Sequence, residues 1–227
     1  MKLYGSLASP YVARVAMFAK LKGIDLPMEP APGGMGSAEY KALNPTGKIP
    51  GLLVDGQCIA ECEVICEYLE SIHPEPALLP QDPMARARSR MISRMTDLYV
   101  APHNTPLTRM RSSGERDQAV VDKCAGEFAK AFSYLESFMA PGTFAARKTP
   151  AIADCALTPF IVLLKRTVFP FFDEVQDPTT AGGRLTAWWQ AIQDHPGCRE
   201  SADEYDRALE KFLEWLWDML AKRNAAR

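Results

Sequence analysis

The stretch Ile49-Pro50-Gly51-Leu52-Leu53-Val54-Asp55-Gly56-Gln57-Cys58-Ile59 carries the clearest signal for the fold. Two short apolar runs flank an Asp-Gly pair, and this dipeptide favours the two-residue turn of a β-hairpin. Further towards the N-terminus, Lys2-Leu3-Tyr4 predicts a strand. Residues 11–22 then predict a helix, because their apolar side chains recur at helical spacing, and Gly23 follows as a C-cap. The first eighty residues of the chain therefore alternate short strands with helices.

Between and after these segments the sequence predicts a second strand, a further helix, a linker and a helical part. Residues 24–29 read as an edge strand because they contain Pro27, and residues 61–71 read as a helix. The predicted order is thus βαβ followed by ββα. Four prolines then mark a linker, and every later segment has helical periodicity. Helices are predicted over residues 84–111, 115–139, 152–168, 184–192 and 202–222.

Composition and charge limit the class of protein. The chain has 227 residues, 47% of them hydrophobic, and a formal net charge of -2. It can bury a core, and this charge gives no reason to expect a nucleic acid or an anionic membrane as partner. We find neither a signal-peptide pattern nor an apolar run long enough to span a bilayer, so a cytoplasmic location is expected. The six cysteines and three histidines lack metal-ligand spacing, and we expect no metal site and no disulfide framework.

Four separated stretches resemble the cytosolic glutathione transferases. Ser9-Pro10-Tyr11-Val12-Ala13-Arg14 resembles the Ser-Pro-(Phe/Tyr)-x-x-Arg helix start of the serine-type members, with the look of tau-, zeta- and omega-like bacterial ones. Residues 44–52 (NPTGKIPGL), 61–69 (ECEVICEYL) and 151–157 (AIADCAL) resemble three further family motifs. The resemblance implies an α/β thioredoxin-like glutathione-binding domain over residues 1–76 and a linker over 77–83. It implies an all-helical domain over 84–227 that contributes the hydrophobic-substrate site.

The resemblance makes Ser9 the candidate catalytic residue. A free thiol has a pKa near ~8.5 and is mostly protonated at neutral pH. A hydroxyl that donates a hydrogen bond to the thiolate, at a helix N-terminus, lowers that pKa. Ser9 precedes Pro10 in the position where both effects act. As an alternative, Ser9 serves only as the N-cap of the helix, and a hydroxyl can fill both roles.

The family motifs also imply which residues bind glutathione. Pro50 is expected to be the cis-proline that presents the Ile49 backbone to the cysteinyl part of the tripeptide, as an added strand would. Glu61 and the helix start at Cys62 would hold the γ-glutamyl end. Cys62 stands where the family has serine, and because a thiol is a weaker donor we expect weakened binding. Lys48 either pairs with the glycine carboxylate or is a solvated surface charge.

The second substrate is expected to be a small hydrophobic electrophile bound between the two domains. Six residues are candidates for that site: Leu7, Met95, Tyr99, His103, Phe160 and Leu164. Three functions stay open. The first is conjugation of glutathione to the electrophile, as in detoxification. The second is a glutathione-dependent isomerisation, dehalogenation or ether cleavage, and the third is a non-catalytic binding or scaffold role.

The same resemblance implies a homodimer. The helix that includes Glu63 and the Arg-rich helix from Met84 would pack against their symmetry mates. The 151–157 motif departs from the family pattern at one position, because Ala151 stands where the family has Ser or Thr as a helix cap. Thr149-Pro150 is a candidate cap one turn earlier. The replacement therefore bears on stability and not on catalysis.

Overall fold

A mixed four-stranded sheet occupies the N-terminal third of the chain. The computed structural model, which describes residues 1–225, orders the strands β2-β1-β3-β4. β2 runs parallel to β1, and β3 is antiparallel to both β1 and β4. The strands are β1 (Lys2–Tyr4), β2 (Met28–Glu29), β3 (Gly51–Val54) and β4 (Gln57–Ala60). This is the predicted βαβ-ββα arrangement, and β2 lies at the edge, as Pro27 led us to expect.

The hairpin between β3 and β4 turns at the Asp-Gly pair. Asp55 has φ 46° and Gly56 has φ 82°, and two positive φ values in succession define a type I′ turn. In the hairpin Leu52 lies opposite Ile59, and Leu53 lies opposite Cys58. The local sequence therefore fixes the register of this half of the sheet.

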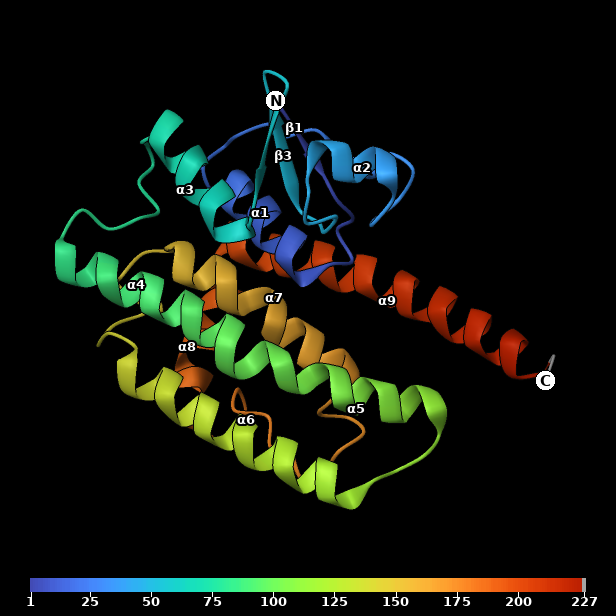
Figure 1. Ribbon diagram of the computed structural model, residues 1–227. Coiled ribbons are helices and arrows are strands. Elements are labelled where there is room, and N and C mark those ends of the chain that lie inside the picture. The colour runs from blue at the N-terminus through green and yellow to red at the C-terminus, as the bar shows by residue number, and fades with distance from the viewer. Residues whose placement is uncertain (226–227) are drawn as a thin grey trace.

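Three helices belong to the sheet region: α1 (Pro10–Leu21), α2 (Ala38–Leu43) and α3 (Cys62–Ile72). α1 packs against α3 on one side and against α7 and α9 on the other, so it lies between the sheet and the helical part (Figure 1). The sequence did not predict α2, which is only six residues long and follows a Gly- and Pro-rich loop. Ser37 starts it by accepting a hydrogen bond from the Tyr40 N–H at 2.9 Å.

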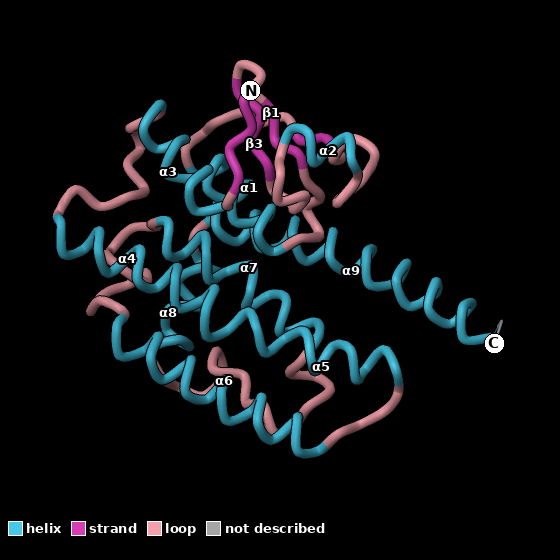
Figure 2. The backbone as a smooth tube through the Cα atoms, viewed as in Figure 1, coloured by secondary structure: helices cyan, strands magenta, loops and turns pink. Residues whose placement is uncertain are grey.

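Helices make up the rest of the structure, as Figure 2 shows in cyan. They are α4 (Pro83–Met95), the π-helical turn η1 (Thr96–Val100), α5 (Ala101–Ser113), α6 (Gln118–Phe138), α7 (Ile152–Thr167), α8 (Arg184–Asp194) and α9 (Pro196–Ala225). The predicted helix over 84–111 is thus interrupted by η1, and Pro102, which lacks an N–H group, follows directly in the first turn of α5. Among the described helices, none has both the length and the apolar character needed to cross a bilayer.

Helix α7 lies at the centre of the helical part, as its apolar sequence predicted. Almost all of its side chains are buried, from Ile152 to Leu164. The predicted alternative cap at Thr149 is wrong, because the helix starts at Ile152 with Ala151 as N-cap. Asp154 in the first turn accepts a hydrogen bond from the Ala151 N–H at 2.8 Å, and this fixes the start of the helix.

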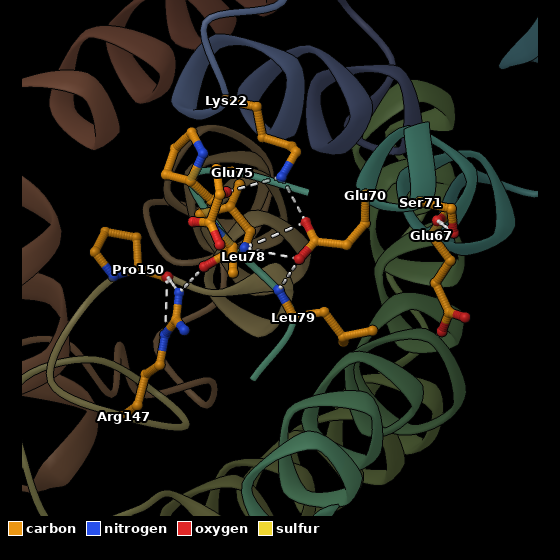
Figure 3. A network of polar contacts seen from close by, with 11 residues as sticks. Lys22, Glu67, Glu70, Ser71, Glu75, Leu78, Leu79, Arg147 and Pro150 are labelled. Atoms are coloured by element: carbon orange, nitrogen blue, oxygen red, sulfur yellow. Dashed lines mark hydrogen bonds and ion pairs between the residues drawn. The ribbon is translucent and has the colours of Figure 1, made fainter. Parts of the chain in front are cut away.

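The segment between the two parts is held by a polar network (Figure 3). The side chain of Lys22 in α1 is fully buried, and its Nζ lies 2.7 Å from Glu70 Oε2 and 2.8 Å from the Pro76 carbonyl oxygen. Glu70 in α3 accepts hydrogen bonds from the N–H groups of Leu78 and Leu79. From the helical side, Arg147 donates to the carbonyl oxygen of Ala77. The segment is therefore bonded to both parts of the molecule.

Candidate active site

The loop before β3 is shaped by one buried side chain. Asn44 is 1% exposed, and its Nδ2 donates to the Lys48 carbonyl oxygen at 2.9 Å. Its Oδ1 accepts from the Thr46 hydroxyl at 2.8 Å, and Gly47 completes the turn with φ 63°. After this turn the Ile49–Pro50 peptide bond is cis, as expected. Among the described residues, no hydrogen bond involves the N–H or C=O group of Ile49.

The N-terminus of α3 lies beside the loop that precedes β3. Glu61 has φ 67°, an unusual value for a residue other than glycine, and Cys62 is the first residue of the helix. The backbone N–H groups of the first helical turn have no partner inside the helix. Burial raises the pKa of the Cys62 thiol to about 11, with Arg14 opposing the shift, so the thiol is neutral near pH 7.

The two segments enclose a cavity of about 230 Å³. All five residues that the sequence suggested for glutathione lie in its wall, from Lys48 on the loop to Cys62 on α3. The complete lining is Tyr11, Thr46, Lys48, Ile49, Pro50, Glu61, Cys62, Arg94 and Asp97. The cavity thus presents two cations, two carboxylates and a free stretch of backbone.

Asp97 reaches this cavity from the helical part and is held by a buried arginine. Arg14 in α1 is fully buried, and its Nη2 lies 2.5 Å from Asp97 Oδ1 while its Nη1 lies 3.1 Å from Asp97 Oδ2. Glu63 shares the same guanidinium at 3.3 Å. Burial raises the pKa of Glu63 to about 7, although the Arg14 charge opposes this shift. The π-helical turn η1 therefore places Asp97 in the wall of this cavity.

Ser9 is the N-cap residue of α1, with Pro10 at the first helical position. The Ser9 hydroxyl makes no capping hydrogen bond, although the residue has the extended backbone of an N-cap. Its neighbour Tyr11 lines the first cavity, and Ala8 and Pro10 line a second one. The Ser9 hydroxyl thus has no capping partner at this helix N-terminus, and Ser9 lies between residues that line the second cavity without itself belonging to either lining.

The second cavity has a volume of about 350 Å³ and lies among α1, α5, α7 and α9. Tyr11 and Phe160 form part of its wall, and their rings meet edge-on with centroids 5.3 Å apart. Tyr11 belongs to both linings, so the two cavities adjoin at this residue.

Comparisons with known proteins agree with this geometry. The family model described as "Glutathione S-transferase, N-terminal domain" matches residues 3–77, and that described as "Glutathione S-transferase, C-terminal domain" matches residues 91–196. Maleylpyruvate isomerase from Ralstonia sp. is 30% identical over 208 residues, covering 84% of this chain and 96% of the relative. The chain belongs to the glutathione S-transferase family.

Two solved structures support this family assignment. The holo structure of maleyl pyruvate isomerase, described as a bacterial zeta-class glutathione S-transferase, has 26% identity and a TM-score of 0.71, over 88% of this chain and 96% of that one. Maleylacetoacetate isomerase from Anaeromyxobacter dehalogenans, with glutathione bound in its active site, has 25% identity and a TM-score of 0.66, over 88% and 93%. The protein is thus an enzyme of the glutathione S-transferase family.

The structure does not bring all the suggested second-substrate residues to the second cavity of this transferase-family protein. Phe160 lines it, and Leu7 packs against the same small apolar cluster. Met95 packs against the main core, and Leu164 is fully buried within that core. Tyr99 packs on Tyr134, and His103 packs on Phe128; both partners belong to α6.

The π-helical turn gives the physical reason for two of these differences. The expectation for Tyr99 and His103 assumed one continuous α-helix, whereas a π-helical turn adds residues to a turn and rotates everything that follows. The α5 residues that line the second cavity are instead Ala101 and five polar residues: Asn104, Thr105, Thr108, Arg109 and Ser112. The sequence holds no local signal for the turn beyond Pro102.

Sequence reasoning also missed residues in the cavity walls. Tyr11, Thr46, Arg94 and Asp97 were not singled out, although Tyr11 and Thr46 lie inside the quoted motifs. The apolar wall from α9 was missed as well, and its helical spacing could have revealed it: Leu209, Phe212, Leu213, Leu216 and Trp217. Within the residues that the structure describes, no cluster of His, Cys, Asp or Glu is arranged to hold a metal ion.

Proposed function

We propose that this protein activates the thiol of glutathione and transfers the resulting thiolate sulfur to a small electrophile, with Ser9 as the activating residue. The observation that carries this proposal is the Ser9 hydroxyl. It sits at the N-terminus of α1 without a capping hydrogen bond, next to Tyr11, which lines both cavities. A hydroxyl donor and the helix N-terminus both favour the charged thiolate over the thiol. Residues 1–76 would bind glutathione, residues 84–227 would contribute the second-substrate site, and residues 77–83 would link them.

Glutathione fits the first cavity by charge and by backbone. Its cysteinyl part would pair with the free N–H and C=O groups of Ile49, as an added strand pairs with a sheet edge. Its ammonium group would face Glu61 and Asp97, and its two carboxylates would face Lys48 and Arg94, with the α3 N-terminus near Cys62 as a further anion site. The thiol would then point to Ser9 and the second cavity.

Isomerisation is a second candidate reaction, favoured by the names of the relatives. A maleylpyruvate isomerase and a maleylacetoacetate isomerase share this fold and this level of identity. A thiolate that adds to a cis double bond leaves a single bond, which can rotate before the sulfur departs. The reaction regenerates glutathione and needs the same activated sulfur as conjugation. The electrophile therefore decides between the two outcomes.

Thiolate absorbance of bound glutathione, followed against pH, tests this proposal. We expect the wild-type complex to ionise with a pKa below that of free glutathione, and Ser9→Ala to raise this pKa by about 1–2 units, since one donor to the charged form is lost. Tyr11→Phe is the matched control, because it removes the other hydroxyl at the junction of the cavities. An unchanged pKa in Ser9→Ala with a raised one in Tyr11→Phe would move the activating role to Tyr11.

Two other outcomes would contradict the proposal more broadly. Glutathione that binds with an unshifted thiol pKa would indicate a carrier of glutathione. Absence of binding at millimolar glutathione would indicate a scaffold that keeps the fold without the chemistry.

We also infer that the protein forms a homodimer, and the exposed apolar surface moves the proposed interface from α3 and α4 to η1 and α6, which pack beside α4. Leu98, Tyr99 and Tyr134 are exposed by 52%, 45% and 42%, although all three are large apolar or aromatic side chains. Tyr99 and Tyr134 meet edge-on, so their exposed surfaces are contiguous. Symmetric dimers are the commonest oligomers and bury such patches against a second copy. Sedimentation equilibrium measures the mass in solution, and a monomer at micromolar concentration would contradict this inference.

A further inference from the structure

The second cavity has two chemically different walls. The wall from α9 is apolar and contains Leu209, Phe212, Leu213, Leu216 and Trp217. The facing wall from α5 is polar and contains Asn104, Thr105, Thr108, Arg109 and Ser112. A purely hydrophobic ligand would leave the second wall without a partner, whereas a ligand with one polar end satisfies both.

Arg109 is the only charged residue in the described lining of this cavity. Among the described residues it takes part in no ion pair, and no carboxylate stands beside it in the wall. Nearby Arg166 is different, because Asp206 lies 2.5 Å and Glu210 lies 2.8 Å from its guanidinium nitrogens. Arg111 is different again, since its guanidinium stacks on the rings of Phe171 and Trp217 at 3.4 Å and 4.6 Å from the ring centroids. Of the three arginines, Arg109 alone has neither a carboxylate nor an aromatic ring as partner among the described residues.

Two of the three α5 hydroxyl groups in this wall are already committed as donors. Thr108 Oγ1 donates to the Asn104 carbonyl oxygen at 3.1 Å, and Ser112 Oγ donates to the Thr108 carbonyl oxygen at 2.8 Å. These hydroxyls offer a ligand only lone pairs, which disfavour an anion. Arg109 therefore supplies the charged donors of the polar wall, in the fork geometry that matches a carboxylate.

We propose that the second-substrate cavity takes an amphiphilic electrophile with an apolar or aromatic body and one anionic group, and that Arg109 selects the anion. The apolar body lies along α9, and the anionic group lies at the α5 wall. The electrophilic carbon then faces Tyr11 and the glutathione sulfur. This inference rests on the proposed transfer function and adds the substrate class, with Arg109 as a specificity-determining residue.

A pair of electrophiles that differ only in charge tests this substrate class. Chlorodinitrobenzoate carries a carboxylate, and its methyl ester is neutral. In both, the glutathione thiolate forms a C–S bond at the chlorinated ring carbon, the C–Cl bond breaks, and chloride leaves with the bonding pair. Each rate is divided by the rate with free glutathione, so that the different intrinsic reactivities cancel.

We expect Arg109→Gln to lower kcat/KM for the carboxylate about threefold to fivefold and to leave the ester unchanged, because Arg109 is exposed and an exposed ion pair contributes a factor of this size. Arg109→Lys should retain most of the preference, and added salt should weaken it in the wild type. Arg199→Gln is the matched control, since Arg199 is an exposed arginine of α9 that does not line the cavity. Equal changes for acid and ester in Arg109→Gln, or no change for either, would overturn the proposal.

Binding without turnover separates this proposal from the proposed function. Dinitrobenzoate and its methyl ester lack the leaving group, so calorimetry with the full-length protein measures their affinity alone. A lower affinity of Arg109→Gln for the acid only, without turnover of either chloro compound, would support the substrate class and contradict the transferase reaction. Turnover of both chloro compounds, with Arg109→Gln changing both rates equally or neither, would support the transferase reaction and contradict the substrate class.

Discussion

At the scale of single residues, the site combines one hydroxyl left free with one thiol held neutral. Ser9 occupies the N-cap position but makes no capping hydrogen bond. Cys62, one cavity wall away, is 6% exposed, and its burial keeps the thiol protonated near pH 7. A neutral thiol is a weak donor and a weak nucleophile, so in the proposed mechanism Cys62 would bind and would not react.

We expect Cys62→Ser to tighten glutathione binding by about threefold to tenfold. The serine hydroxyl is smaller and a better donor to the γ-glutamyl carboxylate, and one such hydrogen bond contributes roughly 1 kcal/mol. Calorimetric titration measures the change, and Cys58→Ser is the matched control because Cys58 does not line the cavity. Weaker binding by Cys62→Ser would show that the thiol is adapted to its place and is not a degraded serine.

At the scale of elements, local sequence predicts what local interactions determine. The β3–β4 hairpin follows from Asp55 and Gly56, and α1 follows from Pro10 and its apolar spacing. The cavity wall formed by residues 48–50 and 61–62 could be suggested from two short motifs, since neighbours within each motif are neighbours in the wall. Asp97 and Arg109 could not be placed in this way, because Asp97 lies within a π-helical turn and Arg109 lies in the helix after it.

The start of helix α7 shows how one buried carboxylate orders several segments. Asp154 is fully buried and accepts hydrogen bonds from the Ala145 N–H at 2.9 Å, the Trp188 indole N–H at 2.8 Å and the Ala151 N–H at 2.8 Å. Burial raises its pKa, and these three donors oppose the shift. The side chain thereby joins α7 to α8 and to the loop before α7.

We expect Asp154→Asn to lower the free energy of unfolding by about 2–4 kcal/mol. The amide must turn an NH₂ group towards at least one of the three donors, which leaves a buried donor unsatisfied. Urea unfolding measures the loss, and the exposed Asp203→Asn is a control that should stay within about 0.5 kcal/mol of wild type. Glutathione affinity of the folded fraction should be unchanged, since Asp154 lies outside both cavities; a lower affinity would connect this carboxylate to the site.

At the scale of the whole molecule, two polar groups with a fully buried cation connect the sheet region to the helical part, in addition to the more exposed ion pairs of Lys20 with Glu204 and of Arg90 with Glu67. The first is the linker network of Lys22, Glu70 and Arg147 (Figure 3). The second is the buried pairing of Arg14 in α1 with Asp97 in η1. Breaking a buried pair leaves an uncompensated charge, so these contacts favour one relative placement of the two parts. The first cavity depends on that placement, because Asp97 and Arg94 come from the helical part and its other lining residues come from the sheet region.

The π-helical turn η1 also ties the site to the proposed dimer, since Asp97 faces the cavity while Tyr99 packs on Tyr134 at the surface. We expect Tyr99→Glu to weaken dimerisation at least a hundredfold, because two symmetric copies would bury unpaired carboxylates at roughly 3 kcal/mol or more. Sedimentation equilibrium measures this change, with Met35→Glu, an exposed loop residue, as control. Glutathione affinity should stay within about twofold of wild type, because Arg14 orients Asp97 within one chain. A dimer as tight as wild type would place the interface elsewhere, and a large loss of glutathione affinity in the monomer would mean that the second copy completes the site.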